Sequence, residues 1–179
     1  MNRSAERLTT ERLVLEPLSV AHAAEMVGVL ADPALYEFTG GEAPTLEELR
    51  NRYARQSAGR SGDGTPWLLN WIVRVKETDM PVGYVQATVE PDGSHDVAEV
   101  AWVISPDHQG HGIASEATAA MLGWLRSQGV DRFAAYIHPE HHASMGVARR
   151  QGLHPKTVVQ DGEIRWALGA GSDHEPGTL

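Results

Sequence analysis

The sequence predicts one domain of mixed α/β class, in which a mostly antiparallel sheet carries helices on both faces. Three β-rich segments, residues 69–76, 82–90 and 97–104, follow one another with turn signals between them, which is typical of an antiparallel meander. Helical segments stand both before and after this meander, and a two-residue hairpin signal lies near the end of the chain. A chain of 179 residues suits one such domain and is long enough to bury a core.

The segment before the meander begins with one strand and one helix. Three consecutive aliphatic residues, ended by Pro17, predict a strand near residues 11–16. Ser19 is a candidate N-cap for a helix over residues 21–30, and the Asp-Pro pair that follows breaks that helix.

A second helix is expected before the meander. Thr45, with Glu48 three residues later, forms the capping-box pattern, and the helix should run to about residue 56. Residues 57–65 are rich in Gly, Ser and Asp and are expected to form a mobile loop.

A loop with two glycines follows the meander, and after it residues 113–128 have helical composition. Gly129 is placed to end this helix. One face of the helix is apolar and should be buried: Ala117, Met121, Trp124 and Leu125.

The last part of the chain predicts one strand, one helix and one hairpin. The strand covers residues 133–137, and the helix covers residues 143–151 before Gly152. Residues 156–160 and 163–168 flank an Asp-Gly pair, which is a strong signal for a two-residue turn.

Composition excludes several classes of function. The chain has no cysteine, so disulfides, thiolate nucleophiles and cysteine-based zinc sites are excluded. The net charge of -9 gives no basic face for nucleic acid, although it suits a cationic amine. No apolar run is long enough for a membrane span, and the polar N-terminus lacks the apolar segment of a signal peptide. We therefore expect a cytoplasmic protein with residues 1–9 as an extension, a domain over residues 10–169 and a disordered tail over residues 170–179.

Gly110 and Gly112 stand between a predicted strand and a predicted helix. The first turn of a helix has unpaired N–H groups and partial positive charge, and glycine lets a phosphate approach those groups. The two glycines therefore predict a pyrophosphate-binding loop. Taken alone, they also fit an ordinary strand–helix turn.

The surroundings of these glycines resemble a known family. Gln109-x-x-Gly112-x-Ala114 matches the signature of the GNAT acetyltransferase superfamily. Three segments are similar to one branch of this superfamily, the ribosomal-protein N-alpha-acetyltransferases. They are the string from Gln109 to Ala117, the opening residues 10–15, and residues 139–144 followed by Gln151-Gly152-Leu153. The resemblance spans about residues 8 to 168.

The resemblance implies a fold and a reaction. In the family the sheet splays open between the fourth and fifth strands, which here are residues 97–104 and 133–137, and the pantetheine arm of acetyl-CoA lies in that gap. Acetyl-CoA is the co-substrate, and its acceptor is usually a primary amine that attacks the thioester directly. The residues expected to bind the co-substrate are Val103, Ile104, Gln109, Gly110, His111, Gly112, Ile113, Ala114 and His141.

The chain departs from the family pattern at three positions. His111 stands where the family often has lysine or arginine, so with His108 the loop carries two groups that titrate near neutral pH. His141 replaces an asparagine that helps to hold CoA in the family. Ala148 replaces the tyrosine that elsewhere in the superfamily often protonates the thiolate.

Two catalytic candidates remain. Ser144 matches a serine that, in this branch, is a candidate proton donor to the leaving thiolate, and it also fits an ordinary serine at a helix start. Glu99, on the strand before the loop, is the candidate general base. Its neighbours Val97, Val100 and Val103 do not decide whether its side chain faces a cleft or solvent.

Other features leave alternatives open. The cluster His138, His141 and His142 has no carboxylate or cysteine partner at a suitable spacing, so we expect no metal. Trp67 and Trp71 are expected in the core. The acceptor is a small-molecule amine or, as the alternative, the N-terminus of a protein. A CoA-binding module without catalysis is the third possibility, and the chain is expected to be a monomer or a homodimer.

Overall fold

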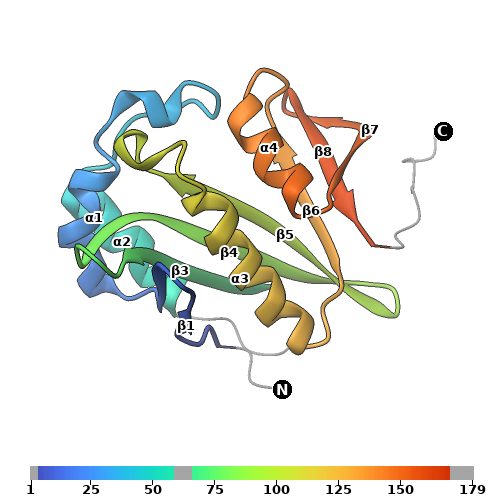
Figure 1. Cartoon of the computed structure of the whole chain (residues 1–179), viewed down its shortest axis with the longest axis horizontal. Helices are drawn as coiled ribbons and strands as arrows, with labels where there is room; N and C mark the ends of the chain where they lie inside the picture. Colours follow the sequence, from blue (N-terminus) through green and yellow to red (C-terminus); the bar gives the residue numbers. More distant parts are fainter. Residues whose placement is uncertain (1–3, 59–65, 170–179) are drawn as a thin grey trace.

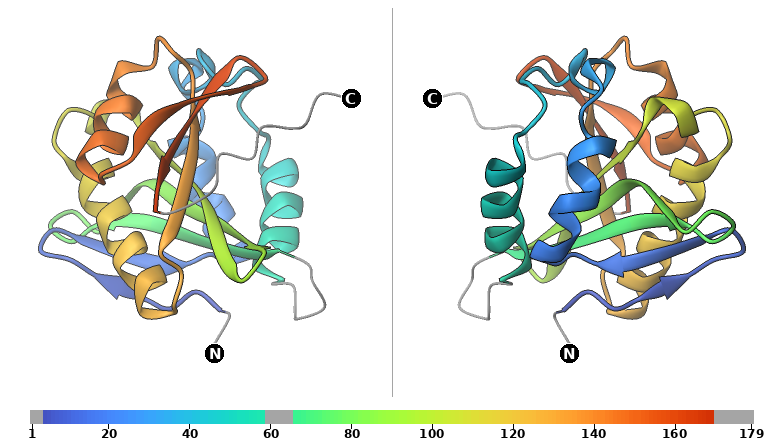
Figure 2. Two further views of the ribbon diagram at one scale, coloured as in Figure 1. Left: turned by 90° about the vertical axis from the view of Figure 1, so that its right-hand side faces the viewer. Right: turned by 90° about the vertical axis from the view of Figure 1, so that its left-hand side faces the viewer.

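The computed structural model describes residues 4–58 and 66–169, which form one eight-stranded sheet with helices on both faces (Figures 1 and 2). The order of the strands in the sheet is β1-β2-β3-β4-β5-β6-β8-β7. The strands are β1 (Leu8–Thr9), β2 (Leu13–Pro17), β3 (Trp67–Val75), β4 (Met80–Asp92), β5 (His95–Ile104), β6 (Arg132–Ile137), β7 (His154–Gln160) and β8 (Glu163–Leu168).

Within the described residues, four α-helices and three short 3-10 helices connect these strands. The α-helices are α1 (Ala23–Val29), α2 (Leu46–Ser57), α3 (Ile113–Ser127) and α4 (His142–Arg150). The 3-10 helices are η1 (Val20–His22), η2 (Pro33–Tyr36) and η3 (Pro106–His108). Figure 2 shows α1 and α2 on one face of the central strands and α3 on the other, as the sequence predicts. No helix of the described residues is long and apolar enough to cross a membrane.

The ends of the helices follow the sequence signals. The Thr45 hydroxyl accepts the Glu48 N–H at 3.2 Å, and the Glu48 carboxylate accepts the Thr45 N–H at 2.8 Å, so the predicted capping box is confirmed. Gly129 and Gly152 follow α3 and α4 with φ of 89° and 85°, in the left-handed conformation that suits the residue after a helix.

Alternation along the strands gives the sheet two apolar faces. One face packs against α3, where Ala117, Met121 and Leu125 are fully buried, and the exposed fraction of Trp124 is 8%. The other face packs against α1 and α2 through a smaller cluster that contains Met26, Leu49, Tyr53 and Ile72. Trp67 and Trp71 are both buried, so their predicted place in the core is confirmed.

The pairing of β5 with β6 is parallel and short. Val97, Ala98 and Glu99 pair with residues 132 to 134, and no pair follows Glu99 and Ala134 along these two strands. The remaining residues of β5 and β6 therefore diverge, with α4 following β6 on one side of the gap (Figure 1). This is the splay that the family resemblance implies between residues 97–104 and 133–137.

Three features differ from the sequence expectations or fall outside the described residues. The short strand β1 lies within the expected extension and pairs antiparallel with β2. The helix expected over residues 21–30 begins as a 3-10 turn, and α1 starts only at Ala23. The expected mobile loop, apart from residues 57 and 58, and the expected tail lie outside the described residues.

Candidate functional site

The two loop glycines have the geometry of an anion-binding helix start. Gly110 and Gly112 have φ of 79° and 77°, and Gly112 is the N-cap of α3. A Cβ atom built on Gly110 would meet nothing within 4 Å, so space lies open beside the loop. The amides of the first turn of α3, from Ile113 onward, have no partner within the helix and can bind a phosphate.

Gln109 fixes the loop to the end of β5. Its side-chain nitrogen donates to the backbone oxygen of Ile104 at 2.9 Å. His108 makes a second internal contact, because its Nδ1 lies 2.9 Å from the Ser105 hydroxyl. Gln109 therefore positions the loop, whereas the exposed His111 side chain has no such contact in the described part of the chain.

Arginine side chains from distant parts of the sequence lie at this loop. The Arg12 Nη1 donates to the backbone oxygen of His111 at 2.9 Å, and its Nε lies 3.3 Å from the Glu116 carboxylate. The Arg150 guanidinium lies 3.5 Å from the Ser115 hydroxyl in the first turn of α3. The loop thus has permanent positive charge beside it, although the family lysine or arginine is missing at His111.

The backbone N–H and C=O groups of successive residues in β5 point alternately toward β4 and toward the side of β6. The Ser105 N–H donates to the oxygen of Val82 on β4, so the alternation directs the N–H and C=O of Val103 toward β4 as well. The corresponding groups of Trp102 and Ile104 then point into the gap on the side of β6. Val103 instead places its side chain against the cluster under α1 and α2.

Glu99 lies at the last pair before the strands separate. It pairs with Thr88 on β4 and with Ala134 on β6, and its exposed side chain lines a cavity of about 280 Å³. The cavity wall also contains Thr88, Glu90, Pro91, Asp92, Val97, Ala134, Tyr136 and Arg165. The structure thus settles that Glu99 faces a cavity.

The surroundings of Glu99 favour its protonated form. Desolvation by the cavity wall raises the pKa of the Glu99 carboxyl, and the negative charge of Glu90 raises this pKa further, while Arg165 opposes both. A carboxylate with a raised pKa is a stronger base than an ordinary glutamate, which suits proton removal from an ammonium group.

Charges near the gap affect the pKa of Glu163 and that of His141. Burial raises the pKa of Glu163 on β8, and the charge of Glu99 raises it further, whereas His138 lowers it. His138 also lowers the pKa of His141. The charges of Glu99 and His138 thus both act on Glu163, and the charge of His138 also acts on His141.

His141 contacts Ser144, the second catalytic candidate. The Nε2 of His141, the N-cap residue of α4, lies 3.3 Å from the Ser144 hydroxyl oxygen. The imidazole ring is stacked on Phe38 with the ring centroids 4.6 Å apart and the planes 18° apart. Burial lowers the pKa of His141, so the ring is neutral at neutral pH and can exchange a hydrogen bond with Ser144.

Two of the three clustered histidines, His138 and His141, lie beside Phe38. The ring centroids of His138 and Phe38 are 5.2 Å apart and their planes are 39° apart. Its Nδ1 accepts the N–H of Glu140 at 3.1 Å. Over the described ranges of the chain, no group of three or more His, Asp or Glu side chains is arranged to hold a metal ion.

Sequence reasoning missed four residues of this site: Arg12, Phe38, Arg150 and Glu163. Arg12 and His111 are 99 positions apart in the chain, and no local pattern signals their contact. Glu163 was considered only as the start of a hairpin strand. One signal was available for Arg150, because it lies just before the Gln151-Gly152-Leu153 motif.

Comparison with known proteins identifies the family. The model of the acetyltransferase (GNAT) domain matches residues 12–154, which is well over half of the chain. The chain therefore belongs to the GNAT acetyltransferase family, and it is an acyl-CoA-dependent N-acetyltransferase. A comparison with curated proteins finds no significant match.

Solved structures share the fold at low sequence identity. A GNAT-family acetyltransferase from Bacillus anthracis superposes with a TM-score of 0.70 at 20% identity, covering 91% of this chain and 98% of that chain. The ribosomal-protein acetyltransferase RimL in complex with coenzyme A gives 0.72 at 18% identity, covering 91% and 97%. An acetyltransferase from Salmonella typhimurium that modifies the N-terminal serine of a ribosomal protein gives 0.72 at 17% identity, covering 93% and 100%.

Proposed function

We propose that this protein moves the acetyl group of acetyl-CoA directly to the nitrogen of a small-molecule amine, at the fork between β5 and β6. The observation that carries the proposal is the position of Glu99. Its carboxylate lies at the last pair of the short parallel ladder, faces a cavity and has a raised pKa. A base at that point is accessible from the face of the sheet that carries α1 and α2.

The glycine loop provides the proposed site for the pyrophosphate of acetyl-CoA. The amides from Gly110 to Ala114 would bind its oxygens, and Arg12 and Arg150 would supply the fixed positive charge. The open space beside Gly110 and the positive φ of both glycines support this fit.

The pantetheine arm would lie in the gap between β5 and β6. Support comes from the alternation that directs the polar backbone groups of Trp102 and Ile104 into this gap. Val103 would contribute through the packing of its side chain against the α1–α2 cluster.

The proposed reaction needs one base and one acid from the chain. Glu99 would take a proton from the ammonium group, directly or through water, and release the free amine. Acetyl-CoA supplies the thioester, whose carbonyl carbon gains a bond to nitrogen and loses its bond to sulfur. The nitrogen loses its second proton to solvent once it has bonded to the carbonyl carbon. Ser144 would give a proton to the departing sulfur and regain one from solvent through the neutral His141, which contacts Ser144, so that neither residue changes its charge over the turnover. The absence of cysteine agrees with direct transfer.

The alternative acceptor is the N-terminus of a protein. Two of the solved structures with this fold are described as acetyltransferases of ribosomal proteins, and this likeness favours it. The cytoplasmic location and the oligomeric state expected from the sequence stay predictions.

The test combines binding with turnover. Calorimetry measures acetyl-CoA affinity, and thiol release is then followed with a panel of primary amines and short peptides with free N-termini. We expect release that depends on the amine, with acetylated amine found by mass spectrometry. A preference for peptides over all small amines would instead support the N-terminus of a protein as the acceptor. Tight binding without amine-dependent release would identify a non-catalytic CoA-binding module instead.

A further inference from the structure

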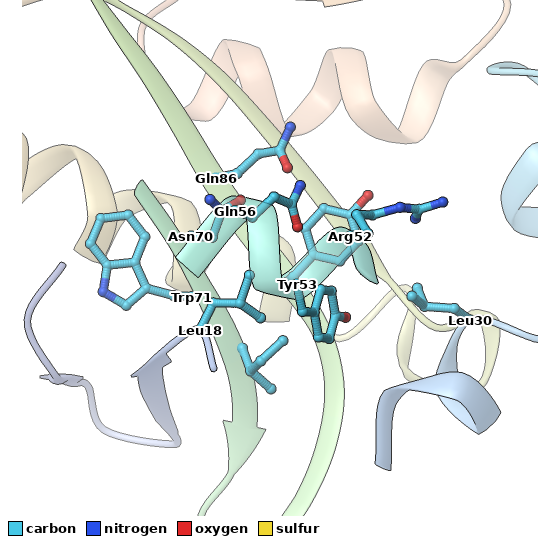
Figure 3. Close-up of a pocket in the computed structure, with 10 residues that line it drawn as sticks. Leu18, Leu30, Arg52, Tyr53, Gln56, Asn70, Trp71 and Gln86 are labelled. Carbon is cyan, nitrogen blue, oxygen red and sulfur yellow. The ribbon is translucent and has the colours of Figure 1, made fainter. Parts of the chain in front are cut away.

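A second cavity lies on the same face of the sheet as Glu99, between the strands and α2. Figure 3 shows Arg52, Tyr53 and Gln56 of α2 beside Asn70 of β3 and Gln86 of β4. The remaining lining residues are Leu18, Leu30, Trp71, Ile72 and Tyr84. Its volume is about 40 Å³. Because about 10–15 Å³ is enough for one water molecule, the cavity has room for about three waters or one carboxylate group.

The Tyr53 side chain lines this cavity, and its hydroxyl has no hydrogen-bond partner among the described residues. Tyr53 is 4% exposed, and its hydroxyl oxygen is buried with no hydrogen bond to any residue in the described ranges. A buried polar group without a partner is costly, so most such groups in proteins are bonded to protein, water or a ligand. The free hydroxyl therefore marks the cavity as a place where a hydrogen-bonding group binds.

The polar groups of the cavity favour an anion. Arg52 is the charged residue among the described residues that line it, and none of those residues carries a carboxylate. Burial raises the pKa of Tyr53 and that of Tyr84, so both hydroxyls stay protonated and can donate. The positive charge of Arg52 acts against both shifts. Two phenols and a guanidinium provide donors that suit the two oxygens of a carboxylate.

The cavity around Tyr53 and the cavity that Glu99 lines are both partly formed by β4. Gln86 of the cavity and Thr88, the partner of Glu99, are two residues apart on β4 and point to the same face. At about 3.4 Å per residue, the two cavities are offset by about 7 Å along this strand. With bonds of about 1.5 Å, an extended chain of about six carbon atoms covers this component along the strand. The two cavities also lie over different strands, β3 and β4 for one and β4, β5 and β6 for the other, so an acceptor that joins them needs at least this chain.

We infer that the cavity around Tyr53 is the specificity subsite of the acceptor, and that the acceptor is an amine whose far end carries a carboxylate. The ammonium end lies among Glu90, Asp92 and Glu99, and the carboxylate end is bound by Arg52 and the Tyr53 hydroxyl. The inference rests on the proposed function, since it assumes that Glu99 receives the amine.

The test compares three acceptors that differ only at the far end: 6-aminohexanoate, 6-aminohexanamide and hexylamine. Thiol release from acetyl-CoA gives kcat/KM for each, and we expect the carboxylate to be favoured about tenfold or more over the other two. Tyr53→Phe and Arg52→Gln should each remove most of this preference through KM, with kcat and acetyl-CoA affinity unchanged. Tyr36→Phe is the matched control, because the Tyr36 hydroxyl donates to the Leu30 oxygen at 2.7 Å and Tyr36 does not line the cavity.

The outcomes separate the two proposals. Equal kcat/KM for the three acceptors, or an equal loss for all three in Tyr53→Phe, would overturn the inference while leaving the proposed function intact. If no amine releases thiol, the proposed function fails, and calorimetry with 6-aminohexanoate still decides the cavity. Binding that is lost in Tyr53→Phe but kept in Tyr36→Phe would support the subsite, and no binding, or binding that Tyr53→Phe retains, would reject it. Tyr53→Phe removes a hydroxyl that has no partner in the part of the chain that the structure describes, so the folding of this variant is not expected to suffer.

Discussion

The imidazole Nε2 of His141 lies 3.3 Å from the hydroxyl oxygen of Ser144 within the first turn of α4, while the other side of the ring is stacked on Phe38. This contact joins a residue expected to hold CoA to a residue expected to protonate the thiolate. Because burial lowers the pKa of His141, the neutral ring is available to Ser144 at neutral pH. We propose that the pair takes the place of the tyrosine that often protonates the thiolate elsewhere in the superfamily, at the position where this chain has Ala148.

The first prediction concerns this pair. Ser144→Ala should lower kcat about tenfold to hundredfold with little change in the KM for acetyl-CoA, because a proton donor is lost but no binding group. His141→Phe keeps an aromatic ring against Phe38 and should lower kcat similarly, and the double variant should be no slower than either single variant. Independent, multiplying effects would mean that the two residues do not act together. Ser127→Ala is the control, since the Ser127 hydroxyl donates to the Trp124 oxygen and accepts from the Gln128 side chain, both at the end of α3.

The second prediction concerns the glycine loop. Gly112→Val should abolish CoA binding, because valine resists a φ of 77° and its side chain would meet the Arg12 guanidinium, 3.5 Å from the added Cβ. Gly123→Val is the matched control within α3, where an added Cβ meets nothing within 4 Å. Calorimetry on both folded variants is the measurement. If Gly112→Val binds CoA with wild-type affinity, the loop is not part of the CoA site.

The third prediction concerns the fixed charge beside the loop. Arg12→Gln should weaken CoA binding about tenfold and reduce its dependence on salt, because it removes both a charge and the contact to the His111 oxygen. Arg12→Lys should retain part of the affinity. Arg55→Gln, an exposed arginine in the last turn of α2, makes the same charge change away from the loop and should bind CoA as the wild type does. Equal CoA affinities in all four proteins would show that the Arg12 side chain does not contribute and that the loop binds CoA through its backbone.

The fourth prediction concerns the pH dependence of the reaction. If Glu99 is the base, kcat/KM for the amine falls as pH decreases through the pKa of Glu99, which is raised above the ordinary glutamate value. Glu90 contributes to this increase, so Glu90→Gln should lower the pKa of Glu99 and move the acidic limb of the profile to lower pH. Glu99→Gln should reduce turnover by roughly a hundredfold or more while acetyl-CoA affinity is kept.

Glu77→Gln is the control for this profile. Glu77 lies in the turn between β3 and β4, and Met80 at the start of β4 is eight residues from Thr88, or about 27 Å of extended strand. Its neutralisation should leave the acidic limb in place. A limb that moves equally in both variants would reflect net charge rather than Glu90, and an unchanged rate in Glu99→Gln would show that water suffices as the base.

Local signals in the sequence predicted most of the fold. The capping box at Thr45 and the glycines after α3 and α4 work through contacts a few residues apart, so they could be recognised directly. The strand β1 was missed because two residues carry no periodicity, and it exists only through its pairing with β2. The place of β8 between β6 and β7 likewise depends on contacts between distant segments.

The candidate site was predictable to a different extent. The loop from Gln109 to Ala114 has a motif, so its position at the start of α3 followed from the sequence. The face of Glu99 did not, because valines stand on both faces of β5 and alternation gave no preference. Arg12, Phe38 and Glu163 reach the site only through the folding of distant segments. Phe38 and Glu163 lie outside any motif, and the motif that contains Arg12 gave no sign of its contact with the loop.

Direct transfer at the fork between β5 and β6 is tested most directly by a single turnover. Enzyme in excess over acetyl-CoA is mixed rapidly with saturating amine, and free thiol, acetylated amine and acetylated protein are measured over time. The account predicts that thiol and acetylated amine appear together at one rate, that this rate falls in Glu99→Gln, and that no acetyl group is found on the protein. If thiol release precedes the acetylated amine and the acetyl group is found on the protein, direct transfer is contradicted.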